Sequence, residues 1–417
     1  MARSPTGPPR RARLSVSAAF LIYAAVFGSW APRIPDVKHA LGLSDGQLGV
    51  ALMGQAAGAL IGTRLAGRAL ERVGSRPAIR VGLVALCAML PAPALAGSLS
   101  LLTAALLLLG GLGGFLDVAM NAQGVAVERA YGRPVMSGLH ALFSGGVLLA
   151  AAAATAAAQA AVRPSVHFAL VGAVLAASSV AALSGLLPIG PEASGARGVG
   201  DRTSPPGWLQ ARDVLLLGVI PFCAVFVEGA AEGWAAVYVR DDLGTGPGAA
   251  GGVFVAFSAT MTGGRLLGDR LSARFGPVAV VRVGSLLAAG GLALGLALNR
   301  PLGALLGFAL LGAGLASVVP IAFSAAGNID ARSGSVMLGR AVTMAYLGSI
   351  IGPLLVGGAA DRVGLPLALG QLVVLTLVVA VLAGTVAAAP GGEGGCGRGW
   401  SGSVSTWLQS STQASQM

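Results

Sequence analysis

The sequence R-L-A-G-R-A-L-E-R-V-G-S-R runs from Arg64 to Arg76, and a related stretch, R-L-L-G-D-R-L-S-A-R-F-G, runs from Arg265 to Gly276. Both begin with R-L-x-G and continue with an acidic residue, further arginines and a glycine. They lie about 200 residues apart, at corresponding positions of the two halves of the chain. An internal repeat of this kind is typical of membrane proteins built from two related halves.

The composition places the chain in a membrane. It has 417 residues, of which 55% are hydrophobic and 10% are charged, and its mean hydropathy is +0.80. Soluble proteins carry about 25% charged residues, so this chain has too few charges to cover its surface in water. The net charge of +11 comes almost entirely from arginines scattered between apolar runs. These features exclude a soluble enzyme, a disordered protein and a nucleic-acid-binding module.

Twelve apolar segments of about twenty residues predict twelve transmembrane helices, because a helix of that length crosses about 30 Å of hydrocarbon. Continuous apolar runs indicate helices, whereas barrel strands alternate polar and apolar residues. We therefore expect an all-α membrane protein with two pseudo-symmetric bundles of six helices. The predicted spans are 14–34, 46–66, 79–97, 101–124, 138–159, 167–188, 213–236, 248–267, 278–298, 302–324, 336–357 and 365–387.

Arginines cluster in the even-numbered loops, on the same side as the basic N-terminus. The loops after spans 2, 4, 6 and 8 all carry them, for example Arg68, Arg129, Arg197 and Arg282. The positive-inside rule then predicts that both termini lie in the cytoplasm. The odd-numbered loops are shorter and balance most of their charges, as in Arg33 with Asp36, Arg240 with Asp241 and Asp242, and Asp361 with Arg362.

A polar stretch rich in Gly, Pro and Ser separates the two halves, as a linker would. The predicted division is a cytoplasmic segment 1–13, a first bundle 14–188, a cytoplasmic linker 189–212, a second bundle 213–387 and a disordered cytoplasmic tail 388–417. The three cysteines are too scattered for a disulfide framework or a metal site, so we expect neither a metal nor another cofactor. Trp30, Trp208 and Trp234 lie near span ends, where tryptophan usually anchors a helix at the membrane interface.

The repeated stretches resemble the cytoplasmic signature of the major facilitator superfamily, G-x-x-x-D-R-x-G-[RK]-[RK]. Glu71 replaces the usual Asp in the first copy, and the acid of the second copy is out of register. The resemblance covers essentially residues 14–387. The stretches F-L-D-V-A-M-N-A-Q-G, G-L-H-A-L-F-S-G-G and E-G-A-A-E-G-W also resemble a bacterial subgroup of uncharacterised facilitators related to fucose permease. The positions that match the signature are Gly67, Glu71, Arg72, Gly74 and Arg76, and Gly268, Asp269, Arg270 and Gly276.

This resemblance implies a bacterial cytoplasmic-membrane protein whose spans 1, 4, 7 and 10 line a central cavity. It also implies that Glu71 and Asp269 face helix ends across the interface between the halves. Acid–arginine pairs at that interface would hold one conformation of an alternating-access cycle, and the signature glycines would permit close helix approach. The alternative is that these arginines only set the topology.

Ionisable and polar residues inside the spans are the candidate binding residues, because a charge at mid-membrane costs roughly 2.5–3.5 kcal/mol on insertion scales. Asp117 and Asn121 share one face of span 4, and Glu228 and Glu232 share one face of span 7. The set that we expect to bind solute or protons is Asp117, Asn121, Glu228, Glu232, Trp30, Arg33 and His140.

Structural roles stay open for several of these residues. Asp117 could instead link to the loop that contains Arg129 and Arg133. Glu232 lies near the outer end of its span, where it could be hydrated or could pair with Arg33. His140 is the only histidine of the set, and packing at a helix end is an alternative to proton relay.

The expected function is secondary active transport of a small solute by alternating access, with proton coupling and uncoupled facilitation both open. There is no nucleotide-binding motif and no soluble domain large enough to bind ATP. His140, Asp117 and Ser144 are the only candidate catalytic set, and their expected placement gives no reason for them to meet, so we expect no enzyme. A non-transporting sensor on the same fold is the rival function. The expected partners are the solute, protons and the lipid bilayer, with no nucleic acid, and the expected state is a monomer.

Overall fold

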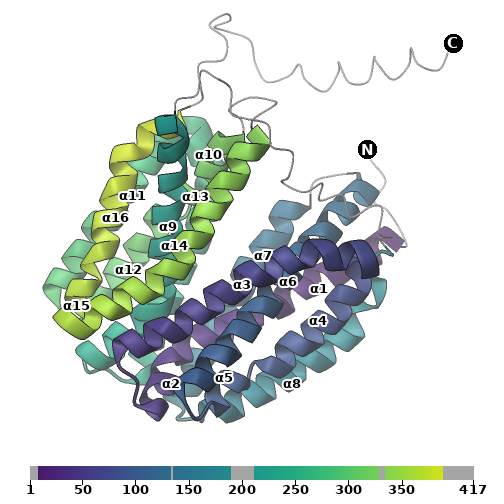
Figure 1. Cartoon of the computed structure of the whole chain (residues 1–417), viewed down its shortest axis with the longest axis horizontal. Helices are drawn as coiled ribbons and strands as arrows, with labels where there is room; N and C mark the ends of the chain where they lie inside the picture. The colour runs from purple at the N-terminus through teal and green to yellow at the C-terminus, as the bar shows by residue number, and fades with distance from the viewer. Residues whose placement is uncertain (1–7, 133–134, 189–210, 328–333, 388–417) are drawn as a thin grey trace, which may run out of the picture. The chain divides into compact units, whose positions relative to one another are not determined.

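The computed structural model describes residues 8–132, 135–188, 211–327 and 334–387 (Figure 1). Within these ranges every regular element is a helix and none is a strand. Residues 189–210 of the predicted linker and the whole predicted tail 388–417 lie outside the described residues. The long helices of the first half are α1 (Pro8–Trp30), α3 (Asp45–Val73), α4 (Ser75–Met89), α6 (Leu99–Tyr131), α7 (Met136–Gln159) and α8 (Pro164–Ala182).

The second half repeats this pattern of long helices. Its helices are α9 (Ala211–Val237), α10 (Pro247–Phe275), α11 (Pro277–Leu298), α12 (Pro301–Leu315), α13 (Val318–Gly327), α14 (Gly334–Val363), α15 (Leu365–Ala368) and α16 (Gly370–Leu382). Short helices complete the described chain: η1 (Ala31–Arg33), α2 (Ile34–Leu41), α5 (Ala92–Leu95), η2 (Leu183–Gly185), η4 (Tyr238–Asp242) and η5 (Ala383–Val386).

Each of the twelve predicted spans is helical in the structure. Eleven stretches of the described chain are helices long and apolar enough to cross a membrane. The span that this criterion omits is α10, a helix of 29 residues that carries many Gly, Ser and Thr residues. Leucines and valines face outward along the helices, and Val81, Leu149 and Val381 are each more than 70% exposed. Lipid would cover such side chains, so the all-α membrane fold is confirmed.

Several predicted spans are not single continuous helices, because they are interrupted at prolines or end at other residues than predicted. Span 10 is divided into α12 and α13, because Pro320 has no N–H to donate to the preceding turn. Span 3 ends early for the same reason, and Pro91 and Pro93 lie between α4 and the end of α5. At the N-terminus α1 begins at Pro8, so the first helix includes part of the predicted segment 1–13.

The internal repeat has a structural counterpart in two matching turns. Gly74 joins α3 to α4 with φ of +75°, and Gly276 joins α10 to α11 with φ of +81°. Only glycine adopts this backbone conformation without strain. The two copies of the signature therefore end in the same tight turn between consecutive long helices.

Glycines let α3 and α6 approach closely within the first half. A Cβ at Gly58 or Gly62 of α3 would overlap backbone atoms of α6, and a Cβ at Gly110 or Gly114 would overlap backbone atoms of α3. Small residues at such positions are how membrane helices pack when lipid is as apolar as the side chains. In contrast, a Cβ at the signature residue Gly67 would meet nothing within 4 Å, so the expectation of close helix approach is wrong at that position.

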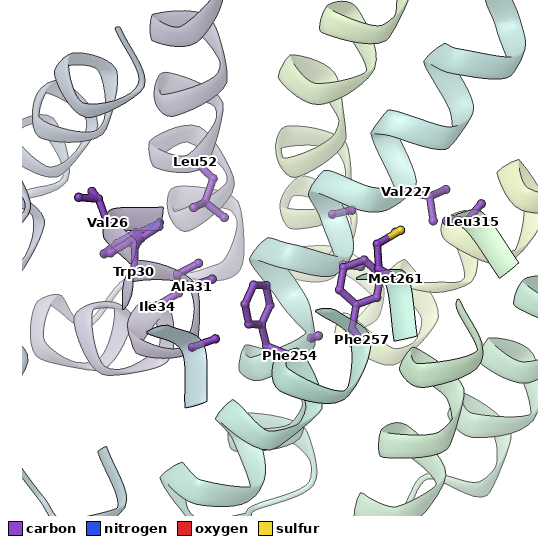
Figure 2. Packing of buried hydrophobic residues seen from close by; sticks show 14 of the residues in the cluster. Val26, Trp30, Ala31, Ile34, Leu52, Val227, Phe254, Phe257, Met261 and Leu315 are labelled. Carbon is purple, nitrogen blue, oxygen red and sulfur yellow. The ribbon is translucent and has the colours of Figure 1, made fainter. Parts of the chain in front are cut away.

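The two halves contact each other through α3 with α14 and through α7 with α10. Aromatic and aliphatic side chains fill part of this interface. Figure 2 shows Trp30 and Leu52 on one side of Phe254, with Met261 on the other. Trp30 is 3% exposed and Trp234 is fully buried. The prediction that these two tryptophans anchor the chain at the membrane interface is therefore wrong, and Trp208 lies outside the described residues.

Candidate functional site

A cavity of about 460 Å³ lies between the two halves of the bundle. Helices α1, α3, α6 and α7 of the first half and α9, α10 and α14 of the second half contribute its lining residues. The expected contribution of spans 1, 4 and 7 is confirmed by α1, α6 and α9. The expected contribution of span 10 is wrong, because no lining residue comes from α12 or α13.

Three carboxylates and one guanidinium group line the cavity. Asp117 comes from α6, Glu228 and Glu232 come from successive turns of α9, and Arg265 comes from α10. Arg265 Nη2 donates to Glu228 Oε1 at 2.6 Å, and both side chains are partly buried. Glu228 therefore has a cationic partner in the same half of the chain. Sequence reasoning assigned Arg265 to the signature stretch and missed this contact.

Asp117 is held by a residue one turn further along α6. Asn121 Nδ2 donates to the Asp117 backbone oxygen at 2.9 Å and to Asp117 Oδ1 at 3.1 Å. Asn121 itself does not line the cavity, so its role is to orient the Asp117 carboxylate, which does. Among the described residues, neither Asp117 nor Glu232 forms an ion pair within 4.0 Å. The alternative link from Asp117 to Arg129 is therefore absent, and Arg133 lies outside the described residues.

Aromatic side chains form much of the cavity wall. Seven of the 29 lining residues are aromatic, whereas 5% of the whole chain is aromatic. The seven are Tyr23, Phe27, Trp30, Phe143, Phe254, Phe257 and Tyr346. Of these seven residues only Trp30 is predicted from the sequence to be at the binding site, because the sequence of an apolar helix does not show which of its aromatic side chains face a cavity.

Two of the predicted binding residues lie elsewhere. Arg33 is 1% exposed, its Nε lies 2.9 Å from Asp36 Oδ2, and its Nη2 donates to the Val162 backbone oxygen. Arg33 and Asp36, which the sequence shows only as balancing charges, thus form an ion pair, and the alternative pairing of Arg33 with Glu232 is wrong. His140 is exposed, hydrogen-bonds Met136 O through Nδ1 and does not line the cavity.

One end of the bundle is tied together by ion pairs between α2 and η4. Lys38 Nζ lies 2.5 Å from Asp241 Oδ2, and His39 Nε2 lies 2.6 Å from Asp241 Oδ1. Arg240 Nη1 lies 3.4 Å from Asp36 Oδ1. These three contacts join the first half to the second, and we call this end the α2 end. The sequence predicts a charge balance among Arg240, Asp241 and Asp242 but no ion pair, and in the structure Arg240 pairs with Asp36.

Hydrogen bonds from α14 and α7 close the same end. Asp361 of α14 accepts from Ser44 Oγ at 3.1 Å and from the Gly46 N–H at 3.0 Å. Its carboxylate thus caps the N-terminus of α3, where negative charge is favourable. Gln159 Oε1 of α7 accepts from the Gly248 N–H of α10 at 2.9 Å. Asp361 and Arg362 balance each other's charge in the sequence, but Arg362 donates to the Gly358 backbone oxygen of its own helix.

The opposite end carries the two signature stretches, and we call it the signature end. Glu71, Arg72, Asp269 and Arg270 are all exposed there. Among the described residues, no ion pair joins one signature stretch to the other. A hydrogen bond between Thr63 Oγ1 of α3 and Tyr346 Oη of α14, at 3.3 Å, also joins the halves.

The remaining signature positions serve the helix turns. Gly74 and Gly276 form the two left-handed turns, and Arg76 is partly buried at the start of α4. A Cβ at Gly268 would lie 2.5 Å from Ser317 Oγ, so this glycine does permit close approach. The predicted gating residues thus lie toward the C-terminal ends of α3 and α10 or just after them, and none of them lines the cavity.

Comparisons with known proteins agree on the type of protein. A sequence profile of the Major Facilitator Superfamily matches residues 16–337 and 217–409. An uncharacterised MFS-type transporter of Yersinia pestis is 32% identical over 90% of this chain and 95% of its own length. The membrane protein MosC of Rhizobium meliloti is 31% identical over 90% of each chain.

Solved structures share the fold at low sequence identity. The nucleoside transporter NupG has a TM-score of 0.69 and 15% identity, covering 90% of this chain and 98% of NupG. A bacterial homologue of the lysosomal transporter Spinster, in an inward-facing conformation, has a TM-score of 0.68 and 15% identity, covering 92% and 97%. The transporter FucP, in an outward conformation, has a TM-score of 0.60 and 18% identity, covering 92% and 100%.

Proposed function

The chain belongs to the major facilitator superfamily, and from this premise we propose that it moves a small solute across the bacterial cytoplasmic membrane by alternating access. The observation that carries the proposal is the cavity between the halves, which holds ionisable side chains and is tied shut at the α2 end. A solute site that reaches one side at a time requires this combination. The protein acts as a monomer in the lipid bilayer and has both termini in the cytoplasm.

The proposed state of the structure is inward-facing. The positive-inside rule puts the arginines of the signature end in the cytoplasm, and the contacts at the α2 end then close the cavity toward the outside. Two comparisons support this assignment, since the TM-score is 0.68 for the inward-facing Spinster homologue and 0.60 for outward FucP.

The proposed binding residues are those that reach the cavity. Asp117 and Glu232 bind solute or protons. The ion pair of Glu228 and Arg265 contributes no net charge to the cavity. Asn121 positions Asp117, and Trp30 contributes to the wall. Arg33 and His140 do not line the cavity, so we assign them positioning roles at the edge of the site.

Proton coupling is part of the proposal because a buried carboxylate can be neutralised by a proton as well as by a cation. Two structures with the same fold are named as proton symporters, one for D-xylose and one for fucose. Asp117 and Glu232 are the described lining carboxylates that form no ion pair within 4.0 Å, so they are the proposed proton sites.

Uptake into proteoliposomes, with and without an imposed pH gradient, tests this function. We expect a solute to accumulate against its concentration gradient only when the pH gradient is present. Uptake that stops at equal concentrations inside and outside, with or without the pH gradient, would replace coupled transport with uncoupled facilitation. Binding of a solute without any uptake would favour a sensor.

A further inference from the structure

We propose that the transported solute is a small organic cation, whose positive group lies near Asp117 and Glu232 and whose apolar part packs against the aromatic wall. This inference rests on the proposed transport function and names its substrate class. It follows from the charges and the aromatic side chains of one cavity.

The charges that line the cavity do not balance. Three carboxylates face one guanidinium, and the Arg265 guanidinium is bound to Glu228 at 2.6 Å. Among the described residues, neither Asp117 nor Glu232 forms an ion pair within 4.0 Å, although Arg265 interacts electrostatically with Glu232 at longer range, and His140 with Asp117. An unpaired charge inside a membrane is unfavourable by about 2.5–3.5 kcal/mol. A cationic solute would supply the missing partner, whereas an anionic solute would increase the imbalance.

The aromatic residues lie in both halves of the cavity wall. Helix α1 contributes Tyr23, Phe27 and Trp30, and α10 contributes Phe254 and Phe257. The face of an aromatic ring attracts a cation by about 0.5–2 kcal/mol, more when water is excluded. An ammonium group that carries hydrocarbon can therefore contact rings and carboxylates at the same time.

Two hydroxyl groups of the lining, those of Thr262 and Ser349, offer no free donor to a sugar or another polyol. A neutral polyol needs many hydrogen-bond partners, because each polar group that is buried unpaired costs free energy. Thr262 Oγ1 donates to the Ser258 backbone oxygen at 2.7 Å, and Ser349 Oγ donates to the Tyr346 backbone oxygen at 2.9 Å. These two hydroxyl donors are engaged by their own helices. Gln55, Ser144 and Ser258 also line the cavity, so the preference for a cation over a polyol rests on the carboxylates and the aromatic rings.

The size of the cavity limits the solute. A volume of about 460 Å³ lies at the lower end of the range of small-molecule sites, which is about 300–1,000 Å³. The cavity therefore suits one compact cation rather than a peptide or a lipid.

The test uses the full chain in proteoliposomes and a defined mixture of solutes. The mixture contains choline, tyramine and agmatine as cations, glucose, mannitol and uridine as neutral compounds, and lactate and gluconate as anions. Mass spectrometry measures what enters, relative to protein-free liposomes. We expect at least one cation to be enriched about tenfold and no neutral or anionic compound to be enriched.

The outcomes separate the substrate class from the function. Enrichment of a neutral or anionic compound without any cation would overturn the inference and keep the transport function. Enrichment of nothing by folded, correctly inserted protein would overturn both.

A binding experiment then assigns the residues. The affinity for the enriched cation is measured from the shift of the thermal unfolding midpoint, because a ligand that binds only the folded state raises it. We expect Asp117→Asn and Glu232→Gln each to weaken binding about tenfold. The matched control Glu393→Gln removes an acid beyond the last predicted span and should leave binding unchanged. Unchanged affinity in both cavity variants would overturn the proposed site.

Discussion

Lys38 Nζ lies 2.5 Å from Asp241 Oδ2, and the two residues belong to opposite halves of the chain. Lys38 is also the only lysine of the sequence, and its ammonium lies 2.6 Å from Asp45 Oδ1. One cation therefore neutralises carboxylates on α3 and η4 and holds the α2 end closed. Because the pair exists only while the halves touch at this end, it stabilises one conformation over the other.

Lys38→Met should open the α2 end more often. Loss of a partly exposed ion pair is worth about 1 kcal/mol, which changes the ratio of two conformations roughly fivefold. The measurement is the rate at which a membrane-impermeant maleimide labels Leu52→Cys in whole cells, since Leu52 lines the cavity and is 6% exposed. We expect the rate to rise several-fold.

The labelling experiment needs a protein without other reactive cysteines and a control variant. Cys87 and Cys223 are buried, and Cys396 can be replaced by serine. Arg300→Met removes an exposed positive charge without touching the ion pairs of the α2 end. A labelling rate that Lys38→Met leaves at the level of Arg300→Met would exclude Lys38 as a closing contact.

The pair of Glu228 and Arg265 should show coupling in a double-mutant cycle. Removal of one partner leaves the other charge uncompensated in a partly buried site, which commonly costs several kcal/mol. We expect Glu228→Gln and Arg265→Gln each to reduce transport more than the double variant does. Initial uptake rates, corrected for the amount of inserted protein, measure this. Independent, additive losses would show that the two side chains act separately.

The sequence predicts the helices well because the hydrocarbon of a bilayer allows a spanning chain few structures other than a helix. Apolar runs of about twenty residues must form helices in a bilayer, and all twelve predicted spans are helical. The repeated signature is also visible in the sequence, but the turns at Gly74 and Gly276 were not predicted, because these glycines were expected to permit close helix approach. Their φ of +75° and +81° with ψ of 163° and 153° is a conformation that glycine adopts without strain.

The cavity could be predicted only in part. Asp117, Glu228 and Glu232 are visible in the sequence because charge is rare inside apolar runs. Arg265 is equally visible, but its contact with Glu228 depends on how α9 and α10 pack. The ion pairs of the α2 end were not predicted, because the sequence shows only that the charges of a loop balance and carries no information on contacts between halves that lie far apart in the chain.

Two glycines of α3 should respond oppositely to the same substitution. Gly62→Ala would place a methyl group against backbone atoms of α6, whereas Gly67→Ala would place it in open space. Overpacking of this kind costs about 1–3 kcal/mol, so we expect a lower unfolding temperature for Gly62→Ala. Gly67→Ala should be neutral or slightly stabilising, because alanine favours a helix over glycine. Equal unfolding temperatures in detergent would mean that α3 and α6 separate readily enough to accept the methyl group.

The exposed acids of the signature end should act on the rate of transport and not on binding. Glu71 and Asp269 have no ion-pair partner among the described residues while the α2 end is closed. If the signature end closes in the opposite conformation, each acid gains arginine partners only there, so its loss destabilises that conformation alone. A surface ion pair contributes up to about 1 kcal/mol, hence we expect Glu71→Gln or Asp269→Asn to lower the uptake rate up to about fivefold.

Solute affinity separates gating from damage to the fold in these signature variants. The cavity lies away from both acids, so the affinity in Glu71→Gln and Asp269→Asn should stay within about twofold of the parent, because gating contacts alter a conformational equilibrium and leave the cavity intact. Labelling of Leu52→Cys from outside should decrease only slightly, since the α2 end keeps its own ion pairs. Unchanged uptake rates in both variants would instead show that the two acids have no role in gating. The arginines beside them would then serve only to orient the chain in the membrane.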